Sequence, residues 1–275
     1  MKKPKVSVIT INFNDAKGLE KTILSVRSQT YKNYEHIIID GGSKDESLNI
    51  IFKYQDGFSK WVSESDKGIY DAQNKGIGFA KGEYCLFLNS GDFLVDEFVL
   101  EKIWKENREA DIIYGDMLID NGNKIVYGKS PDKLSLHTLS YGVLWHCVSF
   151  IRRSLFSKYG RYDLSYKIAA DVAFFLKSIG INGSSVEYCP IAVSQFNTFG
   201  FGSNPKNLEK LELERERMRN EYLNPSQILL VEQFSLMEKN YRILSYFYLP
   251  QFIEFLKSFK SLKLIIRKIF KLIHS

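Results

Sequence analysis

The chain has 275 residues, of which 44% are hydrophobic and 25% charged, and its formal net charge is +6. This length and apolar content suffice for a substantial core, which excludes a disordered protein and favours one α/β domain with appendages. The positive charge does not indicate nucleic-acid binding, because it is concentrated at one end. Residues 251–275 hold five lysines, one arginine and one glutamate, a net +5, which leaves +1 for the rest.

Three widely separated cysteines, Cys85, Cys147 and Cys189, show no spacing typical of a metal site or a disulfide framework, which favours a reducing, cytoplasmic setting. The opening sequence MKKPKVSVITINFN begins with basic residues, but Asn12 and Asn14 interrupt its apolar run and no small-residue cleavage site follows. It therefore resembles a first strand more than a signal peptide. No apolar run reaches the ~18 residues that a membrane-spanning helix requires.

The first 116 residues alternate between strand and helix patterns. Five β-branched and apolar segments are expected strands: residues 5–11, 34–40, 60–64, 82–89 and 111–116. Residues 18–29 have apolar residues at helical spacing. A second helix is expected over 43–54, where Ser43 and Glu46 have the spacing of a capping box. A small and polar segment, 69–82, separates the third and fourth strands. This alternation predicts an α/β fold with a mostly parallel sheet and helices on its faces.

Polar residues follow each of the first four expected strands. They are Thr10, Asn12 and Asn14; Asp40, Gly41 and Gly42; Glu64, Ser65 and Asp66; and Asn89, Ser90, Gly91 and Asp92. Each alone is an ordinary turn or cap residue, but ligands of such sheets bind beyond the carboxyl ends of the strands. The sequence contains neither of the usual glycine-rich phosphate loops. A phosphate ligand would therefore need a divalent cation held by a carboxylate such as Asp92.

Four segments resemble, in consistent order over residues 5–205, the signatures of family 2 glycosyltransferases in the branch that builds bacterial polysaccharides. They are VSVITINFN, IIIDGGSKDES, SESDKGIYDAQNKGIGFAKGEYCLFLNSGD and KIAADVAFFLK. The resemblance implies a GT-A fold over residues 1–205, with a Rossmann-like central sheet, an inverting mechanism and a nucleotide-sugar donor bound with Mn2+ or Mg2+. It further implies transfer of a hexose or N-acetylhexosamine to a saccharide or lipid-linked saccharide, as in capsule, exopolysaccharide or lipopolysaccharide synthesis.

The resemblance also assigns donor contacts. Thr10 and Asn12 match residues that line the nucleoside pocket, Asp40 matches a carboxylate that accepts a hydrogen bond from uracil, and Asp66 matches a second acid near the base and ribose. Lys67 is a candidate phosphate partner. An ionised carboxylate that accepts from an N–H makes a charge-assisted bond, so a UDP-sugar is the expected donor.

Ser90, Gly91 and Asp92 occupy the position of the family's Asp-x-Asp metal motif, and the first acid of that motif is replaced by Ser90. Asp92 is then the one protein carboxylate of the motif, and diphosphate oxygens and waters would complete the shell of the metal, as Mg2+ allows. We therefore expect weak metal binding without donor, with Ser90 at most positioning a water. The alternative is that Asp92 caps a helix beginning near Asp96.

Residues 111–205 are expected to supply the acceptor side. Residues 117–129 contain an Asn-Gly turn typical of a hairpin, and residues 145–156 have the pattern of a strand entering a short helix. His146 matches a position where related sequences carry a histidine. It either lies near the diphosphate or is a hydrogen-bonded histidine packed beside Trp145.

A packed helix is expected over 166–178, with Asp171 at its beginning. The family's usual Glu-Asp pair is Ala170-Asp171 here, so the second acid is retained. The resemblance implies that Asp171 is the base that accepts the proton of the acceptor hydroxyl. Its alternative role is an N-cap.

The segment 196–210 is either a mobile loop that closes over the donor, with Gly200 and Gly202 as hinges, or a plain surface loop. Residues 206–275 are expected to form a helical C-terminal extension. The interleaved charges of residues 207–223 are typical of a solvated helix face.

The last 25 residues, 251–275, have apolar residues three or four positions apart with lysines and an arginine alongside. This basic amphipathic tail fits a helix lying on an anionic membrane, which would place the protein peripherally at the inner face of the plasma membrane. Packing against the protein's own core or a partner is the alternative.

Three functions of different classes remain compatible with the sequence. An inverting glycosyltransferase is favoured. A nucleotidyltransferase of similar fold would need a Gly-rich first loop with a basic residue, which TINFND lacks. A noncatalytic nucleotide-sugar-binding subunit is supported only by the missing first acid of the metal motif.

Overall fold

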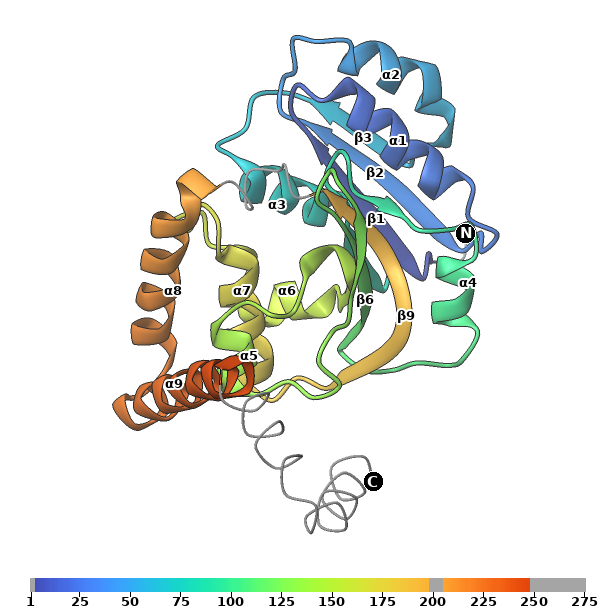
Figure 1. Cartoon of the computed structure of the whole chain (residues 1–275). Coiled ribbons are helices and arrows are strands. Elements are labelled where there is room, and N and C mark those ends of the chain that lie inside the picture. Colours follow the sequence, from blue (N-terminus) through green and yellow to red (C-terminus); the bar gives the residue numbers. More distant parts are fainter. Residues whose placement is uncertain (1–2, 198–204, 248–275) are drawn as a thin grey trace. The chain divides into compact units, whose positions relative to one another are not determined.

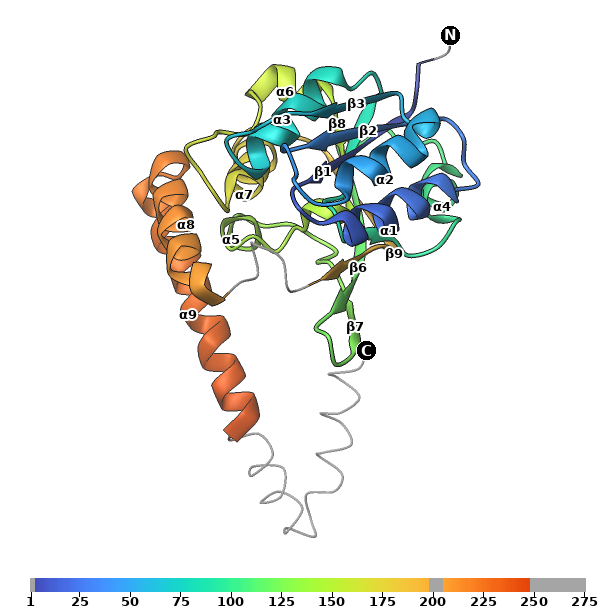
Figure 2. The ribbon, with the colours of Figure 1, turned by 90° about the horizontal axis from the view of Figure 1, so that it is seen from above.

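The computed structural model describes residues 3–197 and 205–247, and Figures 1 and 2 show the chain from two directions. The contacts of the chain divide it into two compact units, Met1–Leu223 and Asn224–Ser275. The glycines at 200 and 202 and the tail 251–275 lie outside the described residues, so the hinge and membrane-helix interpretations stay predictions. No helix in the described part of the chain combines the length and apolarity needed to cross a bilayer.

A single sheet organises the first unit (Figure 1). Its strands are β1 (Val6–Asn12), β2 (Tyr34–Asp40), β3 (Lys60–Ser63), β4 (Tyr84–Phe87), β5 (Phe93–Leu94), β6 (Ile112–Asp120), β7 (Ile125–Gly128), β8 (Ser149–Arg152) and β9 (Val186–Asn197). Their order is β3-β2-β1-β4-β8-β6-β9-β5, and β7 pairs with β6. Strands β3, β2, β1 and β4 are parallel, as are β6 and β9, whereas β8 is antiparallel to both of its neighbours. The expected mostly parallel α/β sheet is confirmed.

Helices cover both faces of the parallel strands. In the first unit they are α1 (Ala16–Arg27), α2 (Ser47–Tyr54), α3 (Ile69–Phe79), α4 (Val99–Trp104), α5 (Leu136–Ser140), α6 (Ser154–Tyr159), α7 (Ala170–Phe175) and α8 (Leu208–Tyr222). Figures 1 and 2 show α1 and α2 on one face of β1–β3 and α3 on the other. The second unit contributes the described helix α9 (Pro225–Phe247).

Burial on both faces explains the composition of the central strands. Every residue of β1 and β4 is buried, as is β2 after its first residue, and such strands are apolar along their whole length instead of alternating. Leu19 and Ile23 of α1 pack with Ile38 on one face. On the other face α3 approaches closely at Gly76, where a Cβ would lie 2.4 Å from the Ile9 side chain.

Several helix starts differ from the expectation. The capping box does not form, because α2 begins at Ser47 and the Ser43 hydroxyl donates to Asp40 Oδ1 instead, at 2.5 Å. The helix that carries Asp171 begins at Ala170 and continues as a π-helical turn over Leu176–Ile181. The long strand β9 was not anticipated. The predicted hairpin is confirmed as β6 and β7, and the strand entering a short helix is confirmed as β8 and α6.

The charged helix α8 is not a solvated helix on all sides. Met218 is completely buried, Glu214 is 8% exposed, and Glu221 Oε2 accepts a 2.8 Å hydrogen bond from the Tyr166 hydroxyl. The predicted solvated face is present, because most of the charged side chains of α8 are exposed. Glu214 is an exception, since its carboxylate binds backbone N–H groups of a neighbouring loop. The boundary expected after residue 205 precedes this helix, which belongs to the first unit by its contacts.

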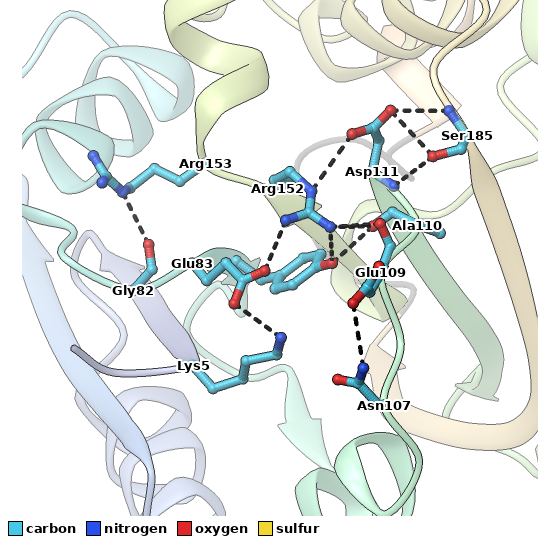
Figure 3. A network of polar contacts seen from close by, with 11 residues as sticks. Lys5, Gly82, Glu83, Asn107, Glu109, Ala110, Asp111, Arg152, Arg153 and Ser185 are labelled. Atoms are coloured by element: carbon cyan, nitrogen blue, oxygen red, sulfur yellow. Dashed lines mark hydrogen bonds and ion pairs between the residues drawn. The ribbon is translucent and has the colours of Figure 1, made fainter. Parts of the chain in front are cut away.

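A polar network holds β8 in place at the amino-terminal edge of the parallel strands (Figure 3). Arg152 donates to Glu83 Oε1 at 2.7 Å and to the Tyr84 hydroxyl at 2.7 Å, and its Nε lies 3.5 Å from Asp111 Oδ1. Lys5 donates to the other oxygen of Glu83 at 2.9 Å. The Arg152 guanidinium thus joins β4 and the residue before β6 to the end of a four-residue strand, and Lys5, next to β1, joins the network through Glu83.

Candidate active site

The register of the parallel strands places three polar side chains side by side. Asn12 is paired with Asp40, and Asp40 with Ser63, at the ends of β1, β2 and β3. Asn12 donates to Asp40 Oδ1 at 2.7 Å, and the Ser63 hydroxyl donates to Oδ2 at 2.6 Å. The expected gathering of polar groups at this edge is therefore present.

Asp40 organises the turn that follows β2. Its side chain is completely buried, and Oδ2 also accepts from the backbone N–H groups of Ser43 at 2.9 Å and Gly42 at 3.2 Å. Burial would raise the pKa of Asp40, but the hydrogen bonds from Ser43, Ser63 and Asn12 outweigh burial and lower it. Protein donors thus occupy both oxygens of an ionised carboxylate, and a direct bond to uracil stays a prediction.

Thr10 faces the interior, and its predicted contact with the nucleoside stays a prediction. It is completely buried, and its hydroxyl lies 3.0 Å from Nε2 of His36, whose pKa burial lowers to about 3. The exposed side chain at this strand end is Phe13, which is 65% exposed. A Cβ at Gly41 would lie 3.2 Å from the Phe13 ring and 2.5 Å from Asp66 Oδ2, so both groups border the Gly41 backbone.

Phe13 is the candidate ligand contact that the sequence reasoning missed. The available signal was an aromatic residue inside the polar stretch Asn12–Asp15, where no core position is expected. A base can stack on such an exposed ring, because every base has a π-face.

The segment after β3 leads directly into α3. Asp66 is half-buried and accepts from the N–H of Gly68 at 2.8 Å. Gly68 has a φ of +117°, a value that favours glycine. Lys67 is exposed, and its backbone N–H donates to Asp71. Asp66 therefore lies at the site edge, whereas no described contact assigns a role to the Lys67 side chain.

The turn after β4 is fixed between β1 and α1. The Ser90 N–H donates to the Ile11 carbonyl at 2.9 Å, and the Gly91 N–H, at a φ of +91°, donates to the Thr22 hydroxyl at 3.1 Å. The same hydroxyl donates to the Asp92 carbonyl at 2.6 Å. A Cβ at Gly18 would lie 2.8 Å from the Gly91 nitrogen, so α1 approaches this turn closely.

Asp92 is 5% exposed and does not cap α4. That helix begins at Val99, and the acid that bonds at its start is Asp96, which accepts from the Phe98 N–H at 2.8 Å. The capping alternative for Asp92 is therefore wrong.

Asp171 lies in the first turn of α7, whose N-cap is Ala169, so the N-cap alternative does not hold. The Tyr70 hydroxyl, from α3, lies 2.8 Å from Asp171 Oδ1 and 2.6 Å from the Ile168 carbonyl oxygen. Burial and the neighbouring Asp171 carboxylate raise the pKa of Tyr70 well above its ordinary value. Tyr70 therefore stays a hydrogen-bond donor at any physiological pH.

His146 packs in an aromatic cluster beside Asp171. Its ring stacks on Phe87 at 4.4 Å, and Nε2 lies 2.7 Å from the Tyr162 hydroxyl. Burial lowers the pKa of His146 to about 4, although Asp171 opposes this shift. The imidazole is therefore neutral at pH 7, and the hydrogen-bonded, packed alternative describes it. A contact with the diphosphate stays a prediction.

The two candidate acids, Asp92 and Asp171, both influence the buried thiol of Cys147. Burial raises the pKa of this thiol, and the charges of Asp92 and Asp171 raise it further. Asp92, in the turn after β4, and Asp171, in α7, are therefore both near enough to this thiol for their charges to act on it.

Comparison with known proteins assigns the family. Residues 7–163 match the family model described as glycosyl transferase family 2. The chain belongs to this family. An uncharacterised glycosyltransferase of Mycobacterium tuberculosis is 38% identical over 208 residues, which cover 73% of this chain and 78% of the relative. A PGL/p-HBAD biosynthesis glycosyltransferase of Mycobacterium bovis is 30% identical over 210 residues, covering 74% and 81%.

Two solved glycosyltransferase structures have a fold similar to that of this chain. TarS of S. aureus in complex with UDP-GlcNAc gives a TM-score of 0.60 at 20% identity, over 70% of this chain and 58% of TarS. The mannosyltransferase PcManGT from Pyrobaculum calidifontis, in complex with GDP-Man and Mn2+, gives 0.55 at 16% identity, over 78% and 61%. The chain thus spans less than two thirds of each structure, and at these identities the likeness establishes the GT-A fold alone.

Family 2 glycosyltransferases of GT-A fold typically bind a divalent metal, and the donor set at this site fits one only in part. No group of three or more His, Cys, Asp or Glu side chains in the described residues could hold an ion. Asp92 supplies one carboxylate at the expected turn. The residues present therefore fit a metal whose remaining ligands come from a bound diphosphate and water.

Proposed function

We propose that the chain is an inverting glycosyltransferase that moves a sugar from a UDP-sugar to a saccharide or lipid-linked saccharide of the bacterial cell surface. The observation that carries this proposal is membership of glycosyl transferase family 2. It is supported by Phe13 and Asp66, which border Gly41 at the strand ends, and by Asp92 and Asp171, whose charges both act on Cys147. One acid is suited to the diphosphate end of a donor and the other to an acceptor hydroxyl.

In this mechanism each part of the site has one task. Phe13 and Asp66 hold the nucleoside. Asp92 would hold a divalent ion, which would neutralise charge on the diphosphate. The acceptor oxygen forms a bond to the anomeric carbon while the bond to the diphosphate oxygen breaks. The proton of the acceptor hydroxyl passes to Asp171, and attack from the face opposite the leaving group inverts the configuration.

The donor is expected to be UDP-linked, with dTDP-sugars as the nearest competitors and GDP-sugars weaker. Asp66→Asn should weaken UDP binding by ~1–3 kcal/mol, the range for a lost bond to a charged group. The matched control is Glu64→Gln, because Glu64 is exposed and pairs with Lys75 at 2.9 Å. Calorimetric titration of both variants with UDP, GDP and dTDP tests this prediction, and a clear preference for GDP would contradict it.

We also propose that residues 251–275 contact the membrane, because this tail carries most of the net charge. A chain ending at residue 250 should no longer co-sediment with vesicles that contain anionic lipid, since each basic residue near such a surface contributes ~1 kcal/mol. Its hydrolysis of the donor should stay close to that of the full chain. Loss of folded protein on truncation would instead support packing of the tail on the protein.

A further inference from the structure

The backbone just before α7 is held by a side chain from α8. Glu214 Oε1 accepts from the N–H of Lys167 at 2.8 Å, and Oε2 accepts from the N–H groups of Ile168 at 2.8 Å and Ala169 at 3.0 Å. One carboxylate thus binds three consecutive N–H groups, and it is only 8% exposed.

A second side chain holds the same segment from α3. Tyr70 is 7% exposed, and its hydroxyl lies within hydrogen-bond distance of both the Ile168 carbonyl and Asp171 Oδ1. The hydroxyl carries one hydrogen, which the two oxygens share. Tyr70 therefore links the carboxylate of Asp171 to the backbone that Glu214 binds.

Asp171 lies in the first turn of its helix, and contacts from outside the helix hold the backbone just before that turn. Helix α7 has six residues before the π-helical turn begins at Leu176. Other residues of α8 bind farther from Asp171: Arg217 donates to the Ser165 hydroxyl at 2.7 Å, and Glu221 accepts from Tyr166. Glu214 is the residue on this face whose hydrogen bonds reach the N-cap of α7.

We propose that Tyr70 and Glu214 are positioning residues that together hold residues 167–169 and fix the Asp171 carboxylate toward the acceptor hydroxyl. This inference rests on the proposed function, in which Asp171 is the base. Its consequence is that α8, which follows the catalytic signatures in the sequence, is part of the catalytic apparatus.

Tyr70→Phe, Glu214→Gln and the double variant test the proposal, with kcat, KM for donor and acceptor, and thermal melting measured for each. Each single variant should lower kcat ~10–100-fold, because a displacement of about 1 Å at the reacting group costs rates of this order, while the donor KM changes less than about twofold. The double variant should be no slower than about the worse single one, because both residues hold one segment. If the fold-loss of kcat in the double variant equals the product of the two single fold-losses, the proposal is wrong.

The split between kcat and KM gives a readout that a purely structural role would not move. A misaligned Asp171 carboxylate slows the chemical step, whereas donor binding does not depend on it, so Tyr70→Phe should lower kcat and leave the donor KM nearly unchanged. A lowered melting temperature with an unchanged kcat would contradict the role of Tyr70.

Glu221→Gln is the matched control, since it weakens the attachment of α8 without touching residues 167–169. It should keep the wild-type kcat, and it should lower the melting temperature less than Glu214→Gln, because Glu214 accepts from three backbone N–H groups. An equal loss of kcat would show a general packing effect and overturn the inference. The failure of the base assignment and the failure of the positioning role can be distinguished. An active Asp171→Asn variant would show that Asp171 is not the base. An inactive Asp171→Asn variant together with fully active Tyr70→Phe and Glu214→Gln variants would contradict only the positioning role.

Discussion

Asp171→Asn is expected to lower the rate of sugar transfer by ~10²–10⁴-fold, the usual contribution of a general base. The amide keeps the shape of the carboxylate, and its oxygen can still accept the hydrogen bond from Tyr70. It cannot take up the proton of the acceptor hydroxyl, because an amide is not basic at neutral pH. Donor affinity and melting temperature should therefore stay close to those of the wild type.

A transfer assay with a panel of UDP-sugars, combined with a thermal melt, separates this role from a structural one. A structural role predicts a lower melting temperature with little change in turnover. An Asn variant that transfers sugar at the wild-type rate would remove Asp171 from the mechanism.

Asp92→Ala is expected to abolish transfer and to abolish metal binding in the presence of UDP. The backbone of the surrounding turn should survive this change, because the hydrogen bonds between Thr22 and the Gly91 and Asp92 backbone and from Ser90 to Ile11 stay in place. Since Asp92 is the one acid of the motif, the wild-type protein should bind Mn2+ measurably only when a diphosphate is present.

Ser90→Ala is the control for this experiment and should change turnover little, because a serine hydroxyl contributes at most a water contact to the ion. Calorimetric titration with Mn2+, in the presence and absence of UDP, measures metal binding by the wild type and by both variants. Near-normal turnover of Asp92→Ala in EDTA would show that the metal assignment is wrong.

Sequence patterns located the parallel strands well, because their β-branched runs are buried on both faces and need no distant information. The patterns failed where distant residues decide the local structure. Ser43 has the spacing of a cap but bonds to Asp40. Likewise α7 begins at Ala170, directly after backbone N–H groups that donate hydrogen bonds to Glu214 of α8.

The candidate site was predictable to the level of strand ends and no finer. Asp40 and Asp66 lie at the expected edge because parallel strands in register end together. Thr10 and Asn12 share one face of β1, but Thr10 lies two residues inside the strand, where it is completely buried. Residue spacing cannot show this depth, and it cannot show that Phe13 projects beyond the edge.

The position of β8 in the sheet also bears on how the chain folds as it leaves the ribosome. Strand β4 lies between β1 and β8, and its partner β8 (Ser149–Arg152) is synthesised much later. Until Arg152 emerges and joins Glu83 and Tyr84, one edge of an apolar strand has no partner, and such edges invite pairing with other chains. We therefore expect the β1–β4 part of the protein to pass through an aggregation-prone interval during translation, which ends when β8 is inserted.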